Sequence, residues 1–279
     1  MRMQYTTLIT CKDLRDHLDN PDWAVFDCRY DLADKEAGWR AYRESHVAGA
    51  TYAHVDRDLS GPPVTDRGRH PLPTPETLNK RFSRMGIAPE TQVIAYDHIG
   101  GAFAARLWWL LRYMGHERVA VLDGGWKTWL AAGLPVRAGE ETRSPALFHG
   151  APLREWVVFA DRVLSQPRLI DSRDPARYRG EVEPIDPAAG HIPGAVNHFW
   201  QNNLQADGTF KPPEQIRAGL QALYGDAAPD EVVFYCGSGV TACHNLLAAA
   251  HAGLPSPRLY AGSWSDWCSD PARPVVTGG

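Results

Sequence analysis

The chain has 279 residues, of which 44% are hydrophobic and 22% are charged, with a formal net charge of −4. This composition is typical of a soluble globular protein that is long enough for two domains. The near-neutral charge excludes an electrostatic basis for binding nucleic acid or an anionic membrane. No window approaches the ~18 apolar residues that a membrane helix needs, and the first residues, Met1 to Thr7, lack the apolar core of a signal peptide.

The first half of the chain alternates predicted helices with short apolar strands. Thr10 is the predicted N-cap of the first helix, and Pro75 stands at the first position of a later one. A loop rich in glycine, proline and arginine is expected over 56–73. The predicted strands are 23–29, 92–97 and 118–122, and the predicted helices begin at residues 11, 75 and 104.

The second half of the chain repeats the order of the first. Each half contains an Asp-x-Arg after a strand and a His-(Val/Ile)-x-Gly-Ala segment, followed by two further strands that match. The matched pairs are 24–29 with 168–173, 46–50 with 191–195, 94–97 with 233–236, and 119–126 with 258–264. Four matches in the same order indicate a duplicated domain, and two large units are not a solenoid.

Alternating strands and helices predict an α/β fold in each unit, with a mainly parallel sheet flanked by helices on both faces. We expect an N-terminal domain over 1–138, a polar linker over 139–152 and a C-terminal domain over 153–279. Sites in such folds lie at the carboxyl ends of the strands. Cys236 stands there in the second unit, and Asp97 stands at the matching position in the first.

The segment around Cys236 carries the strongest chemical signal. Val232 to Tyr235 predict a buried strand, and a helix is predicted from Thr241 to Ala250. Between them, Gly237 and Gly239 allow the loop to curl around one atom. Unpaired N–H groups of such a loop point toward the same spot and stabilise an anion there, so the thiolate of Cys236 is the predicted nucleophile.

The chain has five cysteines, and their pattern supports a further prediction. Their number is odd, their spacing is loose and no CxxC pair occurs, so neither a disulfide framework nor a zinc site is expected, and no cofactor or metal ion is predicted. A reducing compartment suits a free thiol, so we expect a cytoplasmic location. Cys243 is interpreted as a packing residue. The five cysteines are Cys11, Cys28, Cys236, Cys243 and Cys268.

The loop also excludes two kinds of phosphate chemistry. A cysteine-based phosphatase holds its phosphate with an arginine six positions after the cysteine, and Ala242 stands there. A P-loop would need a Gly-Lys-Ser/Thr run, which is absent. We therefore expect a weakly charged or polar substrate at the nucleophilic sulfur.

These residues resemble those of the two-domain rhodanese-type sulfurtransferases, over essentially the whole chain. The resemblance rests on the paired Asp-x-Arg and His-(Val/Ile)-x-Gly-Ala segments and on Asp97, which replaces the active cysteine in the first copy. The loop over 236–241, Cys-Gly-Ser-Gly-Val-Thr, is most similar to that of 3-mercaptopyruvate sulfurtransferases. The resemblance implies two tandem rhodanese-like domains, of which only the C-terminal one is catalytic.

The resemblance also implies a ping-pong sulfur transfer without a cofactor. Cys236 takes a sulfane sulfur from a small donor, forms a persulfide and passes the sulfur to a thiophilic acceptor such as cyanide, a thiol or thioredoxin. Thiosulfate-preferring rhodaneses usually carry two basic residues where this chain has Gly237 and Ser238, so 3-mercaptopyruvate is the favoured donor and thiosulfate the alternative. The loop residues expected to hold the bound sulfur are Gly237, Gly239, Val240 and Thr241.

Further site residues follow from the resemblance position by position. Ser238 matches a serine that relays a proton, and its partners match Asp56 and His70, which implies an Asp56–His70–Ser238 relay. Arg179 matches the arginine that grips the substrate carboxylate. A second arginine of the family is absent, and Arg69 is the candidate to replace it. The Asp-x-Arg pairs are interpreted as pins that hold loops to the sheet ends.

Two other classes of function remain open. A non-enzymatic persulfide carrier or sulfur sensor would load Cys236 and hand the sulfur only to a partner protein. A cysteine phosphatase is the third alternative, and it conflicts with Ala242.

Overall fold

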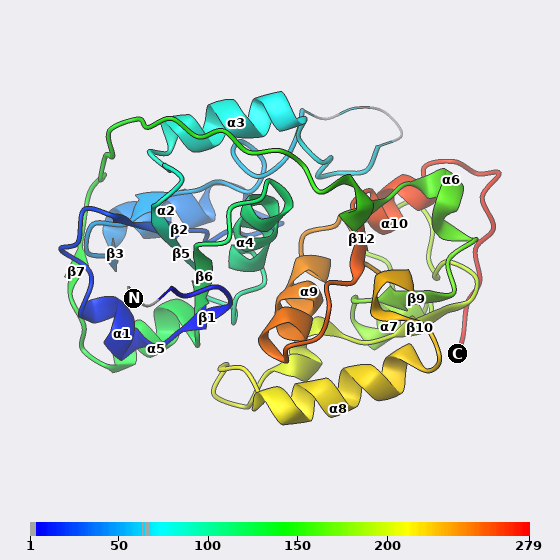
Figure 1. Ribbon diagram of the computed structural model, residues 1–279. Coiled ribbons are helices and arrows are strands. Elements are labelled where there is room, and N and C mark those ends of the chain that lie inside the picture. Colours follow the sequence, from blue (N-terminus) through cyan, green and yellow to red (C-terminus); the bar gives the residue numbers. More distant parts are fainter. Residues whose placement is uncertain (1–3, 63, 65–66) are drawn as a thin grey trace. The chain divides into compact units, whose positions relative to one another are not determined.

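The computed structural model describes residues 4–62, 64 and 67–279, and the chain divides into two compact units (Figure 1). The first unit comprises Met1–Ser60, Pro73–Leu153 and Gln205–Phe210, and the second comprises Gly61–Leu72, Arg154–Leu204 and Lys211–Gly279. Two short segments, 61–72 and 205–210, thus group with the unit formed by the other half of the chain. The boundaries at 138 and 153 stay a prediction, and residues 1–3 of the amino-terminal stretch lie outside the described residues.

The first unit is built on a parallel sheet with strand order β1-β6-β5-β2-β4. Its central strand, β5, is buried throughout and ends directly before Asp97. Because the strands are parallel, their carboxyl ends meet at one edge of the sheet. The strands are β1 (Leu8–Ile9), β2 (Trp23–Asp27), β4 (Thr51–Tyr52), β5 (Gln92–Tyr96) and β6 (Val119–Leu122), while β3 (His46–Val47) and β7 (Val136–Arg137) form an antiparallel pair.

Helices flank this sheet. Thr10 caps the first helix through its side chain, as predicted, and Thr74 caps the helix that Pro75 opens. Helix α4 is apolar on nearly all sides, and all of its residues except Arg112 are buried. The helices of this unit are α1 (Cys11–Arg15), α2 (Ala37–Glu44), α3 (Pro75–Arg84), α4 (Ala104–Tyr113) and α5 (Gly125–Ala131).

The second unit contains a parallel sheet whose strand order, β8-β12-β11-β9-β10, repeats that of the first sheet strand for strand. The predicted α/β duplication is therefore confirmed. The central strand is β11, which corresponds to β5. The strands are β8 (Val157–Val158), β9 (Arg168–Asp171), β10 (Ala195–Asn197), β11 (Val232–Tyr235) and β12 (Arg258–Tyr260).

Helix α9 (Ala242–His251) follows the Cys236 loop and ends before Gly253, close to the predicted bounds. Helix α8 (Pro213–Tyr224) packs alongside it (Figure 1). Within the described residues, every helix is too short or too polar to cross a membrane. The remaining helices are α6 (Ala160–Val163), α7 (Pro175–Tyr178) and α10 (Ser263–Trp267), with 3-10 turns η1 (Arg154–Trp156), η2 (Trp200–Asn203) and η3 (Pro229–Glu231).

The two Asp-x-Arg pairs act as the predicted pins. In the first unit a guanidinium nitrogen of Arg29 lies 2.6 Å from Asp27 and donates to the carbonyl of Ser45. In the second unit Arg173 makes the same contact to Asp171 and donates to the carbonyl of Gly190. Both ion pairs are buried, so each ties a loop firmly to the end of its sheet.

Candidate functional site

Cys236 directly follows the carboxyl end of the central strand β11, and only 2% of its surface is exposed. The N–H of Gly239 points at the sulfur, with 3.2 Å between the nitrogen and Sγ. The backbone N–H of Cys236 itself donates to Oγ of Ser263, at 3.1 Å. N–H groups at the start of α10 hold the other side of the loop, since Trp264 donates to the carbonyl of Cys236 and Ser265 to that of Gly237. The sulfur of Cys236 is thus held at the carboxyl edge of the sheet by hydrogen bonds on both sides of the loop.

The two loop glycines are required for different reasons. Gly239 has φ = 76°, and a Cβ there would lie 2.2 Å from the carbonyl oxygen of Ala261. Gly237 has an ordinary φ, but a Cβ there would lie 3.0 Å from Nη2 of Arg69 and 3.5 Å from Nη1 of Arg177. Gly239 therefore allows the turn, while Gly237 has two guanidinium groups close beside it.

The remaining predicted loop residues close the turn into α9. Val240 is buried, and its carbonyl accepts the N–H of Cys243, with 3.1 Å between the two atoms. Thr241 is the residue before the first helical position. Cys243 is fully buried and its thiol donates to the carbonyl of Gly239 at 3.3 Å, in agreement with a packing role.

Two of the three predicted relay residues meet in the second unit. Nδ1 of His70 lies 2.7 Å from Oγ of Ser238, and both residues are buried. The backbone N–H of the preceding residue, Arg69, donates to Oγ of Ser265 in α10. Arg69 and His70 thus hold their part of the chain against the Cys236 loop and the start of α10.

The third predicted relay residue, Asp56, belongs to the first unit. There its carboxylate accepts a hydrogen bond from the phenol of Tyr30, at 3.0 Å, and pairs with Nζ of Lys35 at 2.9 Å. This carboxylate and the desolvation of the phenol raise the pKa of Tyr30, with desolvation the larger cause. The participation of Asp56 in a relay stays a prediction.

Arg179, the predicted carboxylate ligand, follows the last residue of the short helix α7. Its guanidinium is partly exposed and pairs with the exposed Glu181 at 2.6 Å. Arg177, two residues earlier, points instead to Gly237 of the loop. Residues two apart on a helix face different sides, so only one of these arginines can reach the loop. The sequence analysis did not identify Arg177 as a site residue. The one feature that could have identified it is its place in the same Arg-Tyr-Arg run as Arg179.

A cluster of buried ion pairs borders the Cys236 loop, and the sequence did not indicate it. Arg177 lies 2.7 Å from Glu183 and 3.2 Å from Asp186, while Arg69 pairs with the other oxygen of Asp186. The side chains of both acids are only 3% exposed. Burial lowers the pKa of Arg69, the adjacent Arg177 lowers it further, and the Cys236 thiolate opposes both effects. Arg69 and Arg177 therefore both lie beside Gly237 of the Cys236 loop.

The first unit contains the counterpart of the Cys236 loop, with a carboxylate in place of the thiol. Asp97 is fully buried, and its two oxygens accept four backbone N–H groups at 2.7 to 2.9 Å. A loop of this shape therefore directs several N–H donors at an anion held just beyond Cβ. The donors belong to Ile99, Gly101, Phe103 and Ala104.

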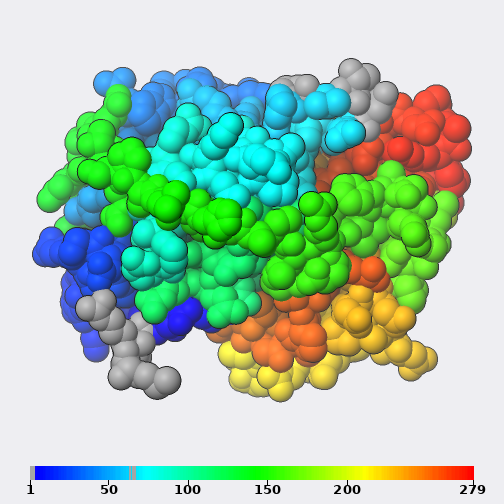
Figure 2. Space-filling model, turned by 45° about the horizontal axis from the view of Figure 1, so that its top comes forward, coloured from blue at the N-terminus to red at the C-terminus, as the bar shows by residue number. Residues whose placement is uncertain are grey.

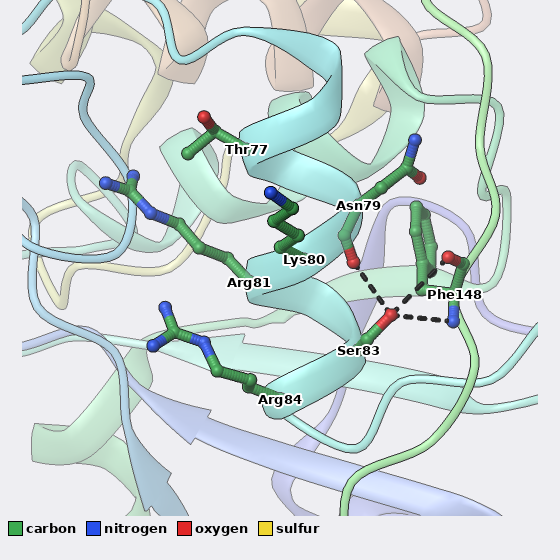
Figure 3. A pocket seen from close by; sticks show the side chains of 7 residues that line it. All are labelled: Thr77, Asn79, Lys80, Arg81, Ser83, Arg84 and Phe148. Atoms are coloured by element: carbon green, nitrogen blue, oxygen red, sulfur yellow. Dashed lines mark hydrogen bonds between the residues drawn. The ribbon is translucent and has the colours of Figure 1, made fainter.

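A separate groove of about 760 Å³ lies on the surface of the first unit, between α3 and the segment 144–150 (Figures 2 and 3). Ser83 holds this segment by accepting the N–H of Phe148, at 3.0 Å. Arg81 is engaged with the carbonyls of Asp58 and Ser60. The lining of the groove contains no cysteine, so it offers no thiol for sulfur transfer. Its lining residues are Thr77, Asn79, Lys80, Arg81, Ser83, Arg84 and Phe148.

Comparisons with known proteins agree with this geometry. A family model described as the rhodanese-like domain matches residues 10–132 and 159–270. The chain is 49% identical to a probable 3-mercaptopyruvate sulfurtransferase of Pseudomonas aeruginosa, over 99% of this chain and 100% of that protein. It is 37% identical to a putative thiosulfate sulfurtransferase of Mycobacterium tuberculosis, over 100% of this chain and 99% of that protein. Its fold is similar to that of a 3-mercaptopyruvate sulfurtransferase from Leishmania major, with a TM-score of 0.82 and 33% identity over 93% of this chain and 73% of that one.

Proposed function

The chain belongs to the rhodanese-like family and is a sulfurtransferase, and from this premise we propose that it takes its sulfur from 3-mercaptopyruvate through a persulfide on Cys236. The observation that carries the proposal is the position of Cys236 at the end of the central strand, with the N–H of Gly239 directed at Sγ. A thiolate held by such a donor is a preorganised nucleophile.

The first half-reaction transfers one sulfur atom to the enzyme. The Sγ thiolate of Cys236 attacks the sulfur of 3-mercaptopyruvate, an S–S bond forms, and the C–S bond of the donor breaks. The bonding electrons leave with the carbon as the enolate of pyruvate, which then takes up a proton. We propose that Ser238 delivers this proton with His70 as its partner, since the two side chains are in hydrogen-bond contact.

The persulfide extends the cysteine side chain by one atom. Its outer sulfur gives up the proton of the donor thiol, which balances the proton that the enolate takes up, and it then carries the negative charge. The counterpart loop around Asp97 supports the idea that this kind of loop can hold such an anion, because four N–H groups surround the Asp97 carboxylate. We expect the N–H groups of the Cys236 loop to serve the same purpose for the outer sulfur.

The carboxylate of the donor needs a cationic partner near the loop. We propose Arg177 for this role, with Arg69 beside it, because both guanidinium groups approach Gly237. Arg179 remains the alternative from the family resemblance, although its guanidinium pairs with Glu181. A bidentate guanidinium matches the two oxygens of a carboxylate.

The second half-reaction passes the outer sulfur to a thiophilic acceptor. Cyanide, a small thiol or the thiols of thioredoxin can attack the outer sulfur, and the Cys236 thiolate leaves. All five cysteines are free, and catalysis requires Cys236 to remain a thiol. We therefore place the enzyme in the cytoplasm, where thiols stay reduced.

Thiosulfate is the second candidate donor. Arg69 and Arg177 border the loop, and a dianion benefits from nearby cations. A carrier that gives its sulfur only to a partner protein is a third reading, in which no small acceptor supports turnover.

The test is a steady-state assay of the purified protein with each donor in turn and cyanide as the acceptor. We expect a larger kcat/KM with 3-mercaptopyruvate than with thiosulfate. Mass spectrometry after donor treatment without acceptor is expected to show one added sulfur on Cys236 and none in Cys236→Ser. Cys11→Ser, which alters a half-buried thiol of the first unit, is the matched control and is expected to keep full activity. Retained turnover in Cys236→Ser would falsify the proposal.

A further inference from the structure

Asp186 connects the two arginines that approach the Cys236 loop. One carboxylate oxygen pairs with Nη1 of Arg69, and the other lies 3.2 Å from Nη2 of Arg177. The backbone N–H of Asp186 donates to Oε1 of Glu183 at 3.0 Å, which fixes the position of the carboxylate. One buried acid thus occupies both cations at once.

The same carboxylate balances the charge beside the nucleophile. Arg69, Arg173 and Arg177 are matched by Asp171, Glu183 and Asp186, so the cluster has no net charge. The acids of the cluster are buried and the two arginines are partly buried, so salt screens these charges less than surface charges, and they act over the few ångströms to Gly237.

Arg69 keeps hydrogen-bonding capacity despite its ion pair. Its Nε is buried and has no hydrogen-bond partner among the described residues. A buried donor without a partner is costly, and an anionic ligand at the loop would satisfy it. The cluster is therefore charge-balanced as a whole but still offers a donor to an incoming anion.

We propose that Asp186 determines which donor this enzyme prefers. Its carboxylate cancels charge beside Gly237, so that the site suits a monoanion such as 3-mercaptopyruvate and disfavours a dianion such as thiosulfate. This inference rests on the sulfurtransferase function proposed above. The physical basis is that the Coulomb energy scales with the product of the charges. Removing one negative charge beside the loop therefore favours a dianion about twice as strongly as a monoanion.

The first experiment compares the two donors in Asp186→Asn, which keeps the size of the side chain. The ratio of kcat/KM for thiosulfate to kcat/KM for 3-mercaptopyruvate is expected to rise by about tenfold relative to the unaltered enzyme. A merely structural role would lower both values together and leave the ratio unchanged. An unchanged or lower ratio overturns the proposal.

Glu181→Gln is the matched control. It removes the same charge from the same part of the chain and frees Arg179. Among the described residues, however, Glu181 is exposed and forms an ion pair with that arginine alone. The ratio is expected to stay constant in this variant. An equal rise in Glu181→Gln overturns the proposal and assigns donor binding to Arg179 or to general surface charge.

Arg69→Met removes a positive charge beside the loop, whereas Asp186→Asn removes a negative one. This second variant provides a test if Asp186→Asn does not fold. The donor ratio is expected to fall in this variant, and a ratio that does not fall overturns the proposal. Circular dichroism and thermal unfolding establish first which of the two variants folds.

Ligand binding to variants that lack the Cys236 thiol tests this inference separately from the proposed function. Titration calorimetry on Cys236→Ser and on Cys236→Ser with Asp186→Asn measures the affinity for thiosulfate and for pyruvate, a monoanion, without turnover. The added substitution is expected to strengthen thiosulfate binding more than pyruvate binding. If the unaltered enzyme transfers no sulfur from either donor, the proposed function fails, while equal effects on both ligands in this titration overturn the role of Asp186.

Discussion

In the second unit, Nδ1 of His70 lies 2.7 Å from the hydroxyl of Ser238, two residues beyond the nucleophilic Cys236. Both side chains are buried, so this hydrogen bond is shielded from competing water. It connects the imidazole of His70 to the Cys236 loop through a single hydroxyl group.

This contact predicts a difference between donors in His70→Gln. With 3-mercaptopyruvate we expect kcat to fall by about 100-fold or more, because the enolate must be protonated as it leaves. With thiosulfate we expect little change, because sulfite leaves as a stable anion. Stopped-flow measurement of the first half-reaction with each donor provides the readout. Equal losses with both donors would show that His70 supports the loop and does not relay a proton.

Ser238→Ala offers a second view of the same relay. We expect the same loss with 3-mercaptopyruvate, and we expect the double variant with His70→Gln to be little worse than either single variant. If the activation free energies lost in the two single variants add up in the double variant, the two side chains act independently, which would contradict a shared proton path.

Gly239→Ala should damage the loop through its backbone. A Cβ there would lie 2.2 Å from the carbonyl of Ala261, in a residue with φ = 76°. We expect a loss of about 2 kcal/mol or more in the free energy of unfolding, together with a large loss of sulfur transfer. Gly219→Ala, in the exposed interior of α8 where a Cβ meets nothing within 4 Å, is the control. It is expected to gain about 0.5–1 kcal/mol, and urea unfolding measures both. A neutral Gly239→Ala would contradict the described turn.

Asp97→Asn should destabilise the first unit. The carboxylate accepts hydrogen bonds from four backbone N–H groups, two on each oxygen. In asparagine an NH2 group replaces one of these oxygens, so two backbone N–H groups would face a donor instead of an acceptor. We expect a loss of about 2–4 kcal/mol in the free energy of unfolding. The exposed Asp19→Asn is expected to change stability by less than about 0.5 kcal/mol. If thermal unfolding of the two variants is the same, the Asp97 loop does not depend on its carboxylate.

Stability should fall as the pH drops below neutral, because burial lowers the pKa of several histidines. The unfolded chain takes up protons at these rings near pH 6.5, whereas the folded chain does so only at lower pH. Stability is therefore fully present above the unfolded pKa and is lost as the pH falls through the folded pKa. These histidines are His54, His116, His198 and His251.

His116 gives the clearest test of this pH dependence. Its Nε2 lies 3.0 Å from the carbonyl of Thr91, a contact that the amide nitrogen of Gln can replace. We expect urea midpoints of the unaltered protein to fall between about pH 7.5 and about pH 5.5. The fall should be smaller in His116→Gln, and an identical fall would exclude His116 as a source of the acid sensitivity.

The fold and the place of Cys236 in it could be predicted from the sequence because their causes are local. Alternating apolar segments define the strands and helices, and Thr10 and Pro75 mark helix starts by chemistry that acts within one turn. The duplication is visible because both copies keep the same Asp-x-Arg pins. Cys236 stands out because a strand, two glycines and a helix follow one another without a gap.

The ion-pair cluster around the loop was decided by the tertiary structure alone. Arg177 and Arg179 differ by two positions, and only the direction of the short helix α7 determines which one reaches Gly237. Asp186 lies in a segment without regular structure, and its pairing with Arg69 joins residues 117 positions apart. Charged side chains on irregular loops follow no periodicity, so their partners depend on how the loops fold over the sheet. The sequence by itself determined where Cys236 lies in the fold, because a strand, a glycine-rich loop and a helix are local patterns, whereas the folded chain determined the charges that surround it.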